Sequence, residues 1–397
     1  MVDILQDGTF AYKRLKKTKQ AEGGSMASVF LGINDRTYTY ESTAARAEHM
    51  GAGVRYPIDF AITDDEIAYI VNRGREDRPD GTRLTVFSLT EEGEEYISTF
   101  GSYGEEPGQF IWPMGIALDK DTNVYVTDEW LHRVTKYDKD GEYISHWGTH
   151  GSGDGELNRP AGIAISKEQT MYIVDSRNNR IQKFSLDGKF LGQFGSAGSE
   201  NGEFNLPWGM CLDAEDNVFV ADWRNDRVQS FTPDGKWLAT FGTPGSAGTI
   251  GTGGNTTNAV IKGGITHSDA PVGHFNRPTG VCVDQDGDIY IADWLNNRVQ
   301  VLTPEGRFIT EFTGDGHLSN MGAAKLRSNP DMIRQRNGIR NFTPERVLWA
   351  PCAVKVGQNN RIIIADTTRH RFQIYRKNTE PVPVSYTHLT LPTSDLV

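Results

Sequence analysis

Six prolines open similar short motifs along the chain, and this repetition constrains the fold more than any other feature. The prolines are Pro57, Pro113, Pro160, Pro207, Pro278 and Pro351. In every copy an Asp or Asn follows the proline after fifteen residues, and in five copies an Arg follows five residues later. Repeats of this size are supersecondary units that must stack on their neighbours to bury their apolar faces.

Each copy is typical of four short strands. Aromatic and β-branched runs such as MYIVD and RIQKF are bounded by Asn, Asp and Gly. Asp-Gly pairs, for example Asp187-Gly188, separate the last two segments and favour a hairpin. The sequence therefore predicts an all-β fold, a six-bladed β-propeller of four-stranded antiparallel blades. Because an open ring leaves exposed sheet edges, we expect the N-terminal segment RTYTYES to supply the fourth strand of the last blade.

The propeller is predicted to span residues 27–383, after a flexible basic arm over residues 1–26. No apolar run is long enough for a membrane span or a secretory signal, so we expect a soluble, cytoplasmic protein without a membrane partner. The last fourteen residues, VSYTHLTLPTSDLV, break the repeat pattern and resemble the translated read-through of a sequencing adapter. We therefore predict that residues 384–397 are a non-native tail.

The third copy, RPAGIAI…MYIVDSRNNRIQKFSLDGKFLGQFGSAGSENGEFNLP, resembles the NHL-repeat family, and the resemblance covers about residues 50–380. It implies a six-bladed propeller. The propeller of peptidyl-amidating lyase is similar in repeat pattern and places zinc-binding histidines directly after blade prolines. Those positions here hold no histidine, so the resemblance implies that this zinc site is absent; they are Ile58, Met114, Ala161, Trp208, Thr279 and Cys352. We expect no metal and no cofactor.

Small residues follow each proline, as expected for the innermost strand of a blade, where space near the axis is scarce. Asp59 and Lys355 break this rule, and a closed ring makes their blades neighbours. Two interpretations stay open: a salt bridge that seals the ring, or a charged pair at the channel mouth that takes part in ligand binding or acid–base chemistry. The three cysteines are interpreted as small buried apolar residues rather than reactive thiols.

Antiparallel connectivity places the loops between strands 2 and 3, and the crossovers between blades, at one end of the propeller. Three long insertions fall there, at about residues 72–82, 242–274 and 314–348. Long loops on a rigid scaffold commonly carry binding sites, although surface loops also lengthen at little cost. The third insertion has a net charge of +3 over 313–349, and Asn329-Pro330 predicts the start of a helix that ends at Gly338.

The candidate binding residues lie at this end and at the channel mouth. Trp and Arg are favoured anchors in interfaces, although some of these tryptophans could simply cover neighbouring loops. The set is Asp59, Arg73, Glu129, Trp130, Arg177, Trp208, Trp223, Arg224, Trp294, Lys355 and Arg369. The repeated Asp and Arg, such as Asp175 with Arg180, are instead predicted to cap the loop between strands 2 and 3.

We interpret the chain as a scaffold that binds a protein, peptide or small ligand through this loop-rich face. The alternative is a hydrolase or lyase of the lactonase or amidating-lyase type with a non-standard central site. A formal net charge of −11 makes a nucleic-acid partner unlikely. Asp284-Gln-Asp286-Gly-Asp288 resembles a calcium loop superficially but lacks its spacing, so we expect a hairpin turn there.

Overall fold

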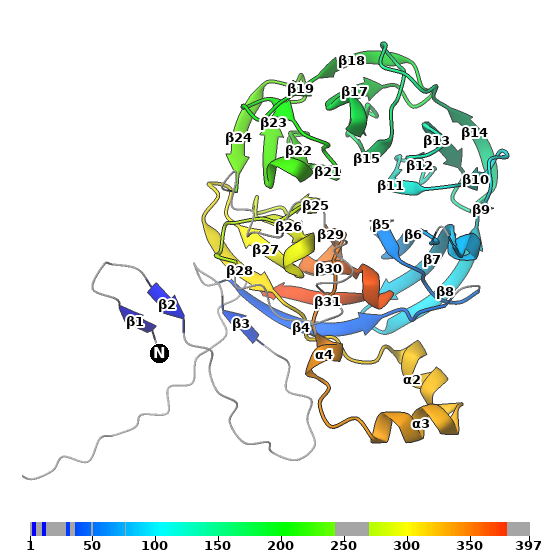
Figure 1. Cartoon of the computed structure of the whole chain (residues 1–397), viewed down its shortest axis with the longest axis vertical. Helices are drawn as coiled ribbons and strands as arrows, with labels where there is room; N and C mark the ends of the chain where they lie inside the picture. The colour runs from blue at the N-terminus through cyan, green and yellow to red at the C-terminus, as the bar shows by residue number, and fades with distance from the viewer. Residues whose placement is uncertain are drawn as a thin grey trace, which may run out of the picture.

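The computed structural model describes residues 36–48, 51–75, 77–242 and 270–378, together with the backbone of three short N-terminal strands. Six antiparallel sheets stand around a common axis, which confirms the predicted six-bladed propeller (Figure 1). In each sheet strand 1 lies nearest the axis, and strand 4 lies outermost in the first five. Within the described part of the chain no helix is long and apolar enough to cross a membrane.

The strands of each blade follow one another in sequence from the axis outward. The first three blades are β5 (Pro57–Ile62), β6 (Ile67–Asn72), β7 (Arg83–Thr90) and β8 (Gly93–Phe100); β11 (Pro113–Leu118), β12 (Val124–Asp128), β13 (Arg133–Tyr137) and β14 (Tyr143–Trp147); and β15 (Pro160–Ile165), β16 (Met171–Asp175), β17 (Arg180–Phe184) and β18 (Phe190–Phe194). The next two are β21 (Met210–Leu212), β22 (Val218–Asp222), β23 (Arg227–Phe231) and β24 (Trp237–Phe241); and β25 (Pro278–Val283), β26 (Ile289–Asp293), β27 (Arg298–Leu302) and β28 (Phe308–Phe312).

The sixth blade is completed by an N-terminal strand, as predicted. It consists of β29 (Ala353–Val356), β30 (Arg361–Asp366), β31 (Arg371–Asn378) and β4 (Thr37–Ala44). β4 runs antiparallel to β31, with Ala44 opposite Phe372 and Thr37 opposite Asn378. A fifth strand, β3 (Val29–Leu31), pairs with the outer edge of β4 and was not predicted. The remaining N-terminal strands, β1 (Val2–Ile4) and β2 (Phe10–Tyr12), form a hairpin.

Small residues near the axis let the inner strands touch backbone to backbone, as the sequence predicted. A Cβ atom on Gly162 would lie 2.7 Å from the carbonyl oxygen of Trp208, and one on Gly280 would lie 2.6 Å from that of Cys352. Larger side chains fill the space between blades; they include Ile116, Ile163, Met210, Val281 and Val354, all of them buried. Burying one such side chain stabilises the fold by about 1.5–3 kcal/mol.

The third insertion carries three helices, α2 (Asn320–Arg327), α3 (Pro330–Asn337) and α4 (Thr343–Arg346). α3 is the predicted helix, and the Asn329 side chain accepts hydrogen bonds from the first-turn N–H groups of Asp331 and Met332. The helices lie beyond the outer edge of the ring beside β31 and β4 (Figure 1). These helices therefore lie outside the ring and do not surround its centre. Contacts with the outer strands hold them there, since the N–H of Met321 donates to Glu94 at 2.7 Å.

Other predictions about the chain ends and insertions reach beyond the described residues. The second insertion lies outside them over residues 243–269, as does the tail predicted over 384–397. The predicted arm over residues 1–26 is described only at β1 and β2. The first insertion is described except at residue 76, and it contains the short 3-10 turn η1 (Pro79–Gly81).

Candidate functional site

The loops between strands 2 and 3 are fixed by a repeated ion pair, in agreement with the structural role predicted for it. In four blades the carboxylate at the end of strand 2 accepts the Nε–H of the arginine that begins strand 3. The pairs are Asp175–Arg180 (2.8 Å), Asp222–Arg227 (2.9 Å), Asp293–Arg298 (2.8 Å) and Asp366–Arg371 (2.7 Å). The second blade differs, because Asp128 accepts only backbone N–H groups from its own loop and from the preceding crossover.

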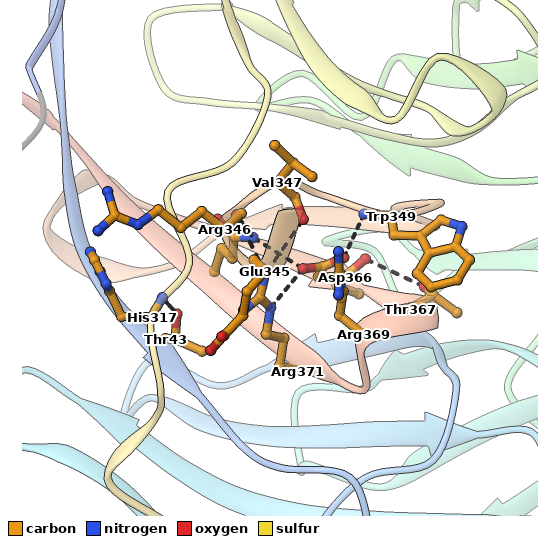
Figure 2. A network of polar contacts seen from close by, with 12 residues as sticks. Thr43, His317, Glu345, Arg346, Val347, Trp349, Asp366, Thr367, Arg369 and Arg371 are labelled. Carbon is orange, nitrogen blue, oxygen red and sulfur yellow. Dashed lines mark hydrogen bonds and ion pairs between the residues drawn. The ribbon is translucent and has the colours of Figure 1, made fainter. Parts of the chain in front are cut away.

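Figure 2 shows how this pair also fixes the crossover in the last blade. Asp366 accepts the N–H of Trp349 at 2.8 Å, while a guanidinium nitrogen of Arg371 donates to the carbonyl of Glu345 at 2.7 Å. Burial raises the pKa of Asp366, against the opposing effect of Arg371. The pair thus ties two loops together and positions Trp349 and Arg369 at the same end of the blade.

A second hydrogen bond connects successive blades at five junctions. The residue before strand 3 has a positive φ, and its side chain accepts the N–H of the residue that precedes the next blade's proline. These inter-blade clasps join His132 to Arg159 (3.0 Å), Asn179 to Leu206 (2.7 Å), Asp226 to Arg277 (2.8 Å), Asn297 to Ala350 (2.8 Å) and His370 to Tyr56 (2.9 Å). The last clasp closes the ring. Together the clasped loops and crossovers form what we call the rim.

One group of rim residues, the Trp112 cluster, consists of Trp112, Trp130, Arg73, Arg159 and Glu129. The Trp112 and Trp130 rings meet edge to face with centroids 5.1 Å apart, and the guanidinium of Arg73 lies 4.8 Å from the Trp112 centroid. The Glu129 carboxylate pairs with Arg73 at 3.4 Å and with Arg159 at 3.1 Å. The two arginines are therefore already neutralised by an acidic group of the chain itself.

A different group, the Trp223 cluster, lies on the fourth and fifth blades and consists of Trp208, Trp223, Trp294, Arg224 and Arg277. The centroid of the Trp223 ring lies 5.6 Å from that of Trp208 and 6.4 Å from that of Trp294. The Arg277 guanidinium stacks on Trp223 at 4.3 Å, and that of Arg224 lies 5.8 Å from the same ring. The structure thus joins four of the predicted residues and adds Arg277.

The arginines of the Trp223 cluster differ from those of the Trp112 cluster in their electrostatics. Within the described residues neither Arg224 nor Arg277 makes a direct ion pair. Burial lowers the pKa of Arg277, although the nearby Asp226 carboxylate opposes this effect. The Nη1 of Arg277 and the Nε1 of Trp223 are buried and have no hydrogen-bond partner in the part of the chain described. Leaving such a donor buried without an acceptor costs free energy.

The other predicted residues lie apart from these two clusters. Arg369 stacks on Trp349 at 5.4 Å and donates to the carbonyl of Pro344. Arg177 is exposed on its loop. Asp59 and Lys355 lie in the channel rather than on the rim, and they form an ion pair of 3.3 Å between the first and last blades. The Asp59 carboxylate also accepts the N–H of Ile116 at 3.2 Å.

The central channel is almost closed. Its cavity measures about 20 Å³ and is lined by the inner strands of the blades, and one water molecule needs about 10–15 Å³ on this scale. Burial lowers the pKa of Lys355, but Asp59, Cys282 and Cys211 together raise it by more, so the net shift is upward and the ammonium form is retained. The geometry therefore fits a salt bridge between the first and last blades, the first of the two interpretations.

Two further predictions concern potential metal and thiol chemistry. Asp284, Asp286 and Asp288 come together, but the Lys377 ammonium lies among them at 2.6, 2.6 and 2.8 Å. This lysine on β31 supplies the cation that the acidic turn requires and ties the fifth blade to the sixth. The three cysteines are free thiols; burial raises the pKa of Cys211 and raises that of Cys352 to about 11.

Sequence reasoning missed the crossover residues Trp112, Arg159, Arg277 and Trp349. They lie one or two residues before a blade proline, and the sequence analysis predicted no role for these positions. The sequence does contain a signal for the clasps. In five blades a His, Asn or Asp stands four residues after the repeated Asp. These residue types tolerate a positive φ and offer an acceptor, which predicts the clasps.

Family models match two parts of this chain. Residues 117–261 match the SMP-30/gluconolactonase/LRE-like region, and residues 275–302 match the NHL repeat. Protein brain tumor of Drosophila melanogaster is 28% identical over 125 residues, which cover 27% of this chain and 12% of that protein. E3 ubiquitin-protein ligase TRIM71 of Xenopus tropicalis is 56% identical over 36 residues, which cover 9% and 4%. The chain thus spans only a small part of the curated relatives it matches.

Solved structures share the fold at low sequence identity. A structural genomics protein from Bacteroides thetaiotaomicron superimposes with a TM-score of 0.53 at 17% identity, covering 86% of this chain and 76% of that one. An auxiliary nutrient binding protein from the same organism gives a TM-score of 0.53 at 10% identity, with the same coverage. Fold and repeats define a six-bladed propeller with a closed centre and an aromatic, arginine-rich rim. The two family-model matches and the six-bladed fold support an NHL/SGL-like propeller.

Proposed function

We propose that this propeller is a binding scaffold whose rim receives an acidic segment of a protein partner, with the Trp223 cluster as the anchor. The observation that carries the proposal is the Arg277 guanidinium, stacked on Trp223 with a buried Nη1 that no described residue satisfies. Arg277 as a whole is only partly buried, so its guanidinium can pair with a carboxylate of the partner through a charge-assisted hydrogen bond. Trp208 and Trp294 provide apolar surface on either side.

The closed channel supports binding over catalysis. A cavity of about 20 Å³ has no room for a substrate, and its one carboxylate and one ammonium group pair with each other. The match to the SMP-30/gluconolactonase/LRE-like region supports the alternative, a hydrolase or lyase. In that case the ion pair between Asp59 and Lys355 would have to open, and one of the two side chains would have to contact the substrate at the channel mouth.

An acidic polypeptide fits the rim better than a nucleic acid does. Single-stranded nucleic acids bind along an extended basic groove with stacking aromatic residues. Here Glu129 neutralises Arg73 and Arg159, so of the two aromatic clusters only the one around Trp223 keeps arginines without a direct ion pair among the described residues. The NHL relatives support a binding role in general. The inference that the partner is acidic depends on the arginines around Trp223.

Fluorescence anisotropy with the whole chain tests the proposal, using labelled oligoglutamate as the probe. We expect saturable, salt-sensitive binding that the double variant R224Q/R277Q abolishes. R307Q is the matched control, because Arg307 lies on the opposite turn of the fifth blade and is exposed. Equal binding of oligolysine, or tighter binding of oligouridylate, would overturn the acidic-partner proposal. Lactone hydrolysis that is lost in K355M would establish the alternative.

A further inference from the structure

A second cavity lies away from the rim, at the seam where the first and last blades meet. This seam pocket measures about 290 Å³, compared with about 20 Å³ for the central channel, and it can hold a small organic molecule. Three segments line it: β4 from Tyr40 to Ala44, the turn and strand around Thr90 and Glu94, and the residues 317–320 that lead into α2.

One wall of the seam pocket is made rigid by its own hydrogen bonds. The Tyr40 hydroxyl and the Thr43 hydroxyl lie 2.7 Å apart, and both accept the backbone N–H of His317, at 3.3 and 3.1 Å. Figure 2 shows His317 beside Thr43. The Tyr40 and His317 rings meet edge to face with centroids 5.6 Å apart. These contacts fix the main chain of the insertion against β4, so the cavity has a defined shape.

Three other polar side chains of the lining have no hydrogen-bond partner among the described residues. They are the Ser42 hydroxyl, the Asn320 amide and the His317 imidazole. The Asn320 amide lies beside Gly93, where a Cβ atom would approach it to 3.0 Å. Burial and the charges of Arg346 and Arg371 lower the pKa of His317, so its ring is neutral at neutral pH. The pocket therefore offers both hydrogen-bond donors and acceptors.

The charge of the lining decides what kind of ligand fits. Among the described residues no Lys or Arg contributes to it, whereas Glu41 and Glu94 both do. Glu41 pairs with Arg361 at 2.7 Å and with Arg376 at 3.0 Å. Glu94 accepts only backbone N–H groups, those of Met321 and Ala45, and no basic side chain of the described residues pairs with it. A carboxylate keeps free lone pairs after two such bonds.

We propose that the seam pocket binds a small primary amine, whose ammonium group pairs with the Glu94 carboxylate. Ser42, Asn320 and His317 then contact polar groups on the rest of the ligand, and Leu89 and Ile374 contact its carbon atoms. An anionic ligand is disfavoured, because it would meet a carboxylate that lacks a counter-cation. The ligand also touches both blades of the seam, so binding stabilises the closed ring.

Calorimetry with the whole chain and two matched probes tests this proposal. Putrescine carries amines where 1,4-butanediol carries hydroxyls on the same carbon chain. We expect putrescine to bind saturably and to raise the melting temperature, and the diol to bind at least about tenfold more weakly. E94Q should lose the preference for the amine, while E95Q, which alters an exposed neighbour on the same strand, should keep it.

A second variant guards against indirect effects, because Glu94 also holds the N-terminus of α2. S42F leaves Glu94 in place and fills the cavity, so it should abolish putrescine binding in a folded protein. W223A should leave putrescine binding unchanged, which separates this pocket from the rim. Equal affinity for amine and diol, full binding in S42F or E94Q, or no saturable binding of putrescine would overturn the proposal.

Discussion

The two aromatic clusters of the rim use the same residue types but differ in what neutralises their arginines. In the Trp112 cluster, Glu129 holds Arg73 and Arg159 at 3.4 and 3.1 Å. In the Trp223 cluster, Arg277 stacks on the ring at 4.3 Å and no described carboxylate pairs directly with it. The first cluster is complete within the chain, whereas the second leaves a buried donor unsatisfied. The comparison places a cluster whose arginines are neutralised within the chain beside one that we propose to bind a partner.

The largest effect is expected from removing the unpaired guanidinium. R277Q should weaken oligoglutamate binding by about 2 kcal/mol or more, because a buried charged donor that meets a partner carboxylate is a typical hot spot. Anisotropy titrations measure this effect. R277K retains the charge but loses the planar stacking, so it should recover only part of the affinity. Full affinity in R277Q would show that the Trp223 cluster is not the anchor.

A smaller effect of opposite sign is expected in the other cluster. E129Q removes the carboxylate that neutralises Arg73 and Arg159, which makes the Trp112 cluster resemble the Trp223 cluster. Oligoglutamate should then bind about 1 kcal/mol more tightly, with a steeper dependence on salt. The same titration in two salt concentrations checks this. An unchanged affinity would mean that neutralisation does not distinguish the clusters.

The clasps beside the clusters differ in their response to pH. Burial and the nearby His150 and Arg159 lower the pKa of His132, so the unfolded chain takes up the proton first. Stability from this clasp is therefore present above pH ~6.5 and lost as the pH falls. Burial raises the pKa of Asp226, so its effect has the opposite sign. As the pH rises through the range where this carboxyl titrates, its contribution to folding stability falls.

H132N tests the pH difference, because Asn179 and Asn297 form the same clasp in other blades without titrating. Melting temperatures measured on both sides of pH ~6.5 should fall less on acidification in the variant than in the parent chain. An equal fall of the melting temperature in both proteins would show that His132 does not cause the pH dependence.

The smallest effect is expected for a rim arginine outside both clusters. Arg177 is exposed, and substitutions at such positions usually change stability by less than about 0.5 kcal/mol. R177Q should leave both oligoglutamate affinity and melting temperature nearly unchanged. A loss as large as that of R277Q would mean that the whole rim, rather than one cluster, attracts the acidic probe.

The repeats predicted the ring and its closure because these depend on local patterns that recur in register. Pro57 and its five counterparts mark each innermost strand, and the RTYTYES segment has the alternation of an outer strand. The same regularity predicted the Asp–Arg pairs and placed Trp223 and Trp294 at one end. These features follow from strand order alone.

The features that the sequence did not predict depend on contacts between residues far apart in the chain. The outward position of α2 depends on the Glu94–Met321 bond, across 227 residues, and the stacking of Arg277 on Trp223 follows from the Asp226 clasp. Lys377 occupies the acidic turn of the fifth blade, a pairing across 93 residues that no local pattern indicates. The seam pocket likewise exists only where three distant segments meet.

The most direct test of the account compares the two tryptophans that centre the clusters. W223A and W112A remove the same side chain from equivalent aromatic and arginine surroundings, and oligoglutamate affinity can be measured for both under one set of conditions. The account predicts that W223A loses about 2 kcal/mol or more of binding free energy, while W112A loses less than half as much. Equal losses, or a larger loss in W112A, would contradict the assignment of the Trp223 cluster as the binding anchor.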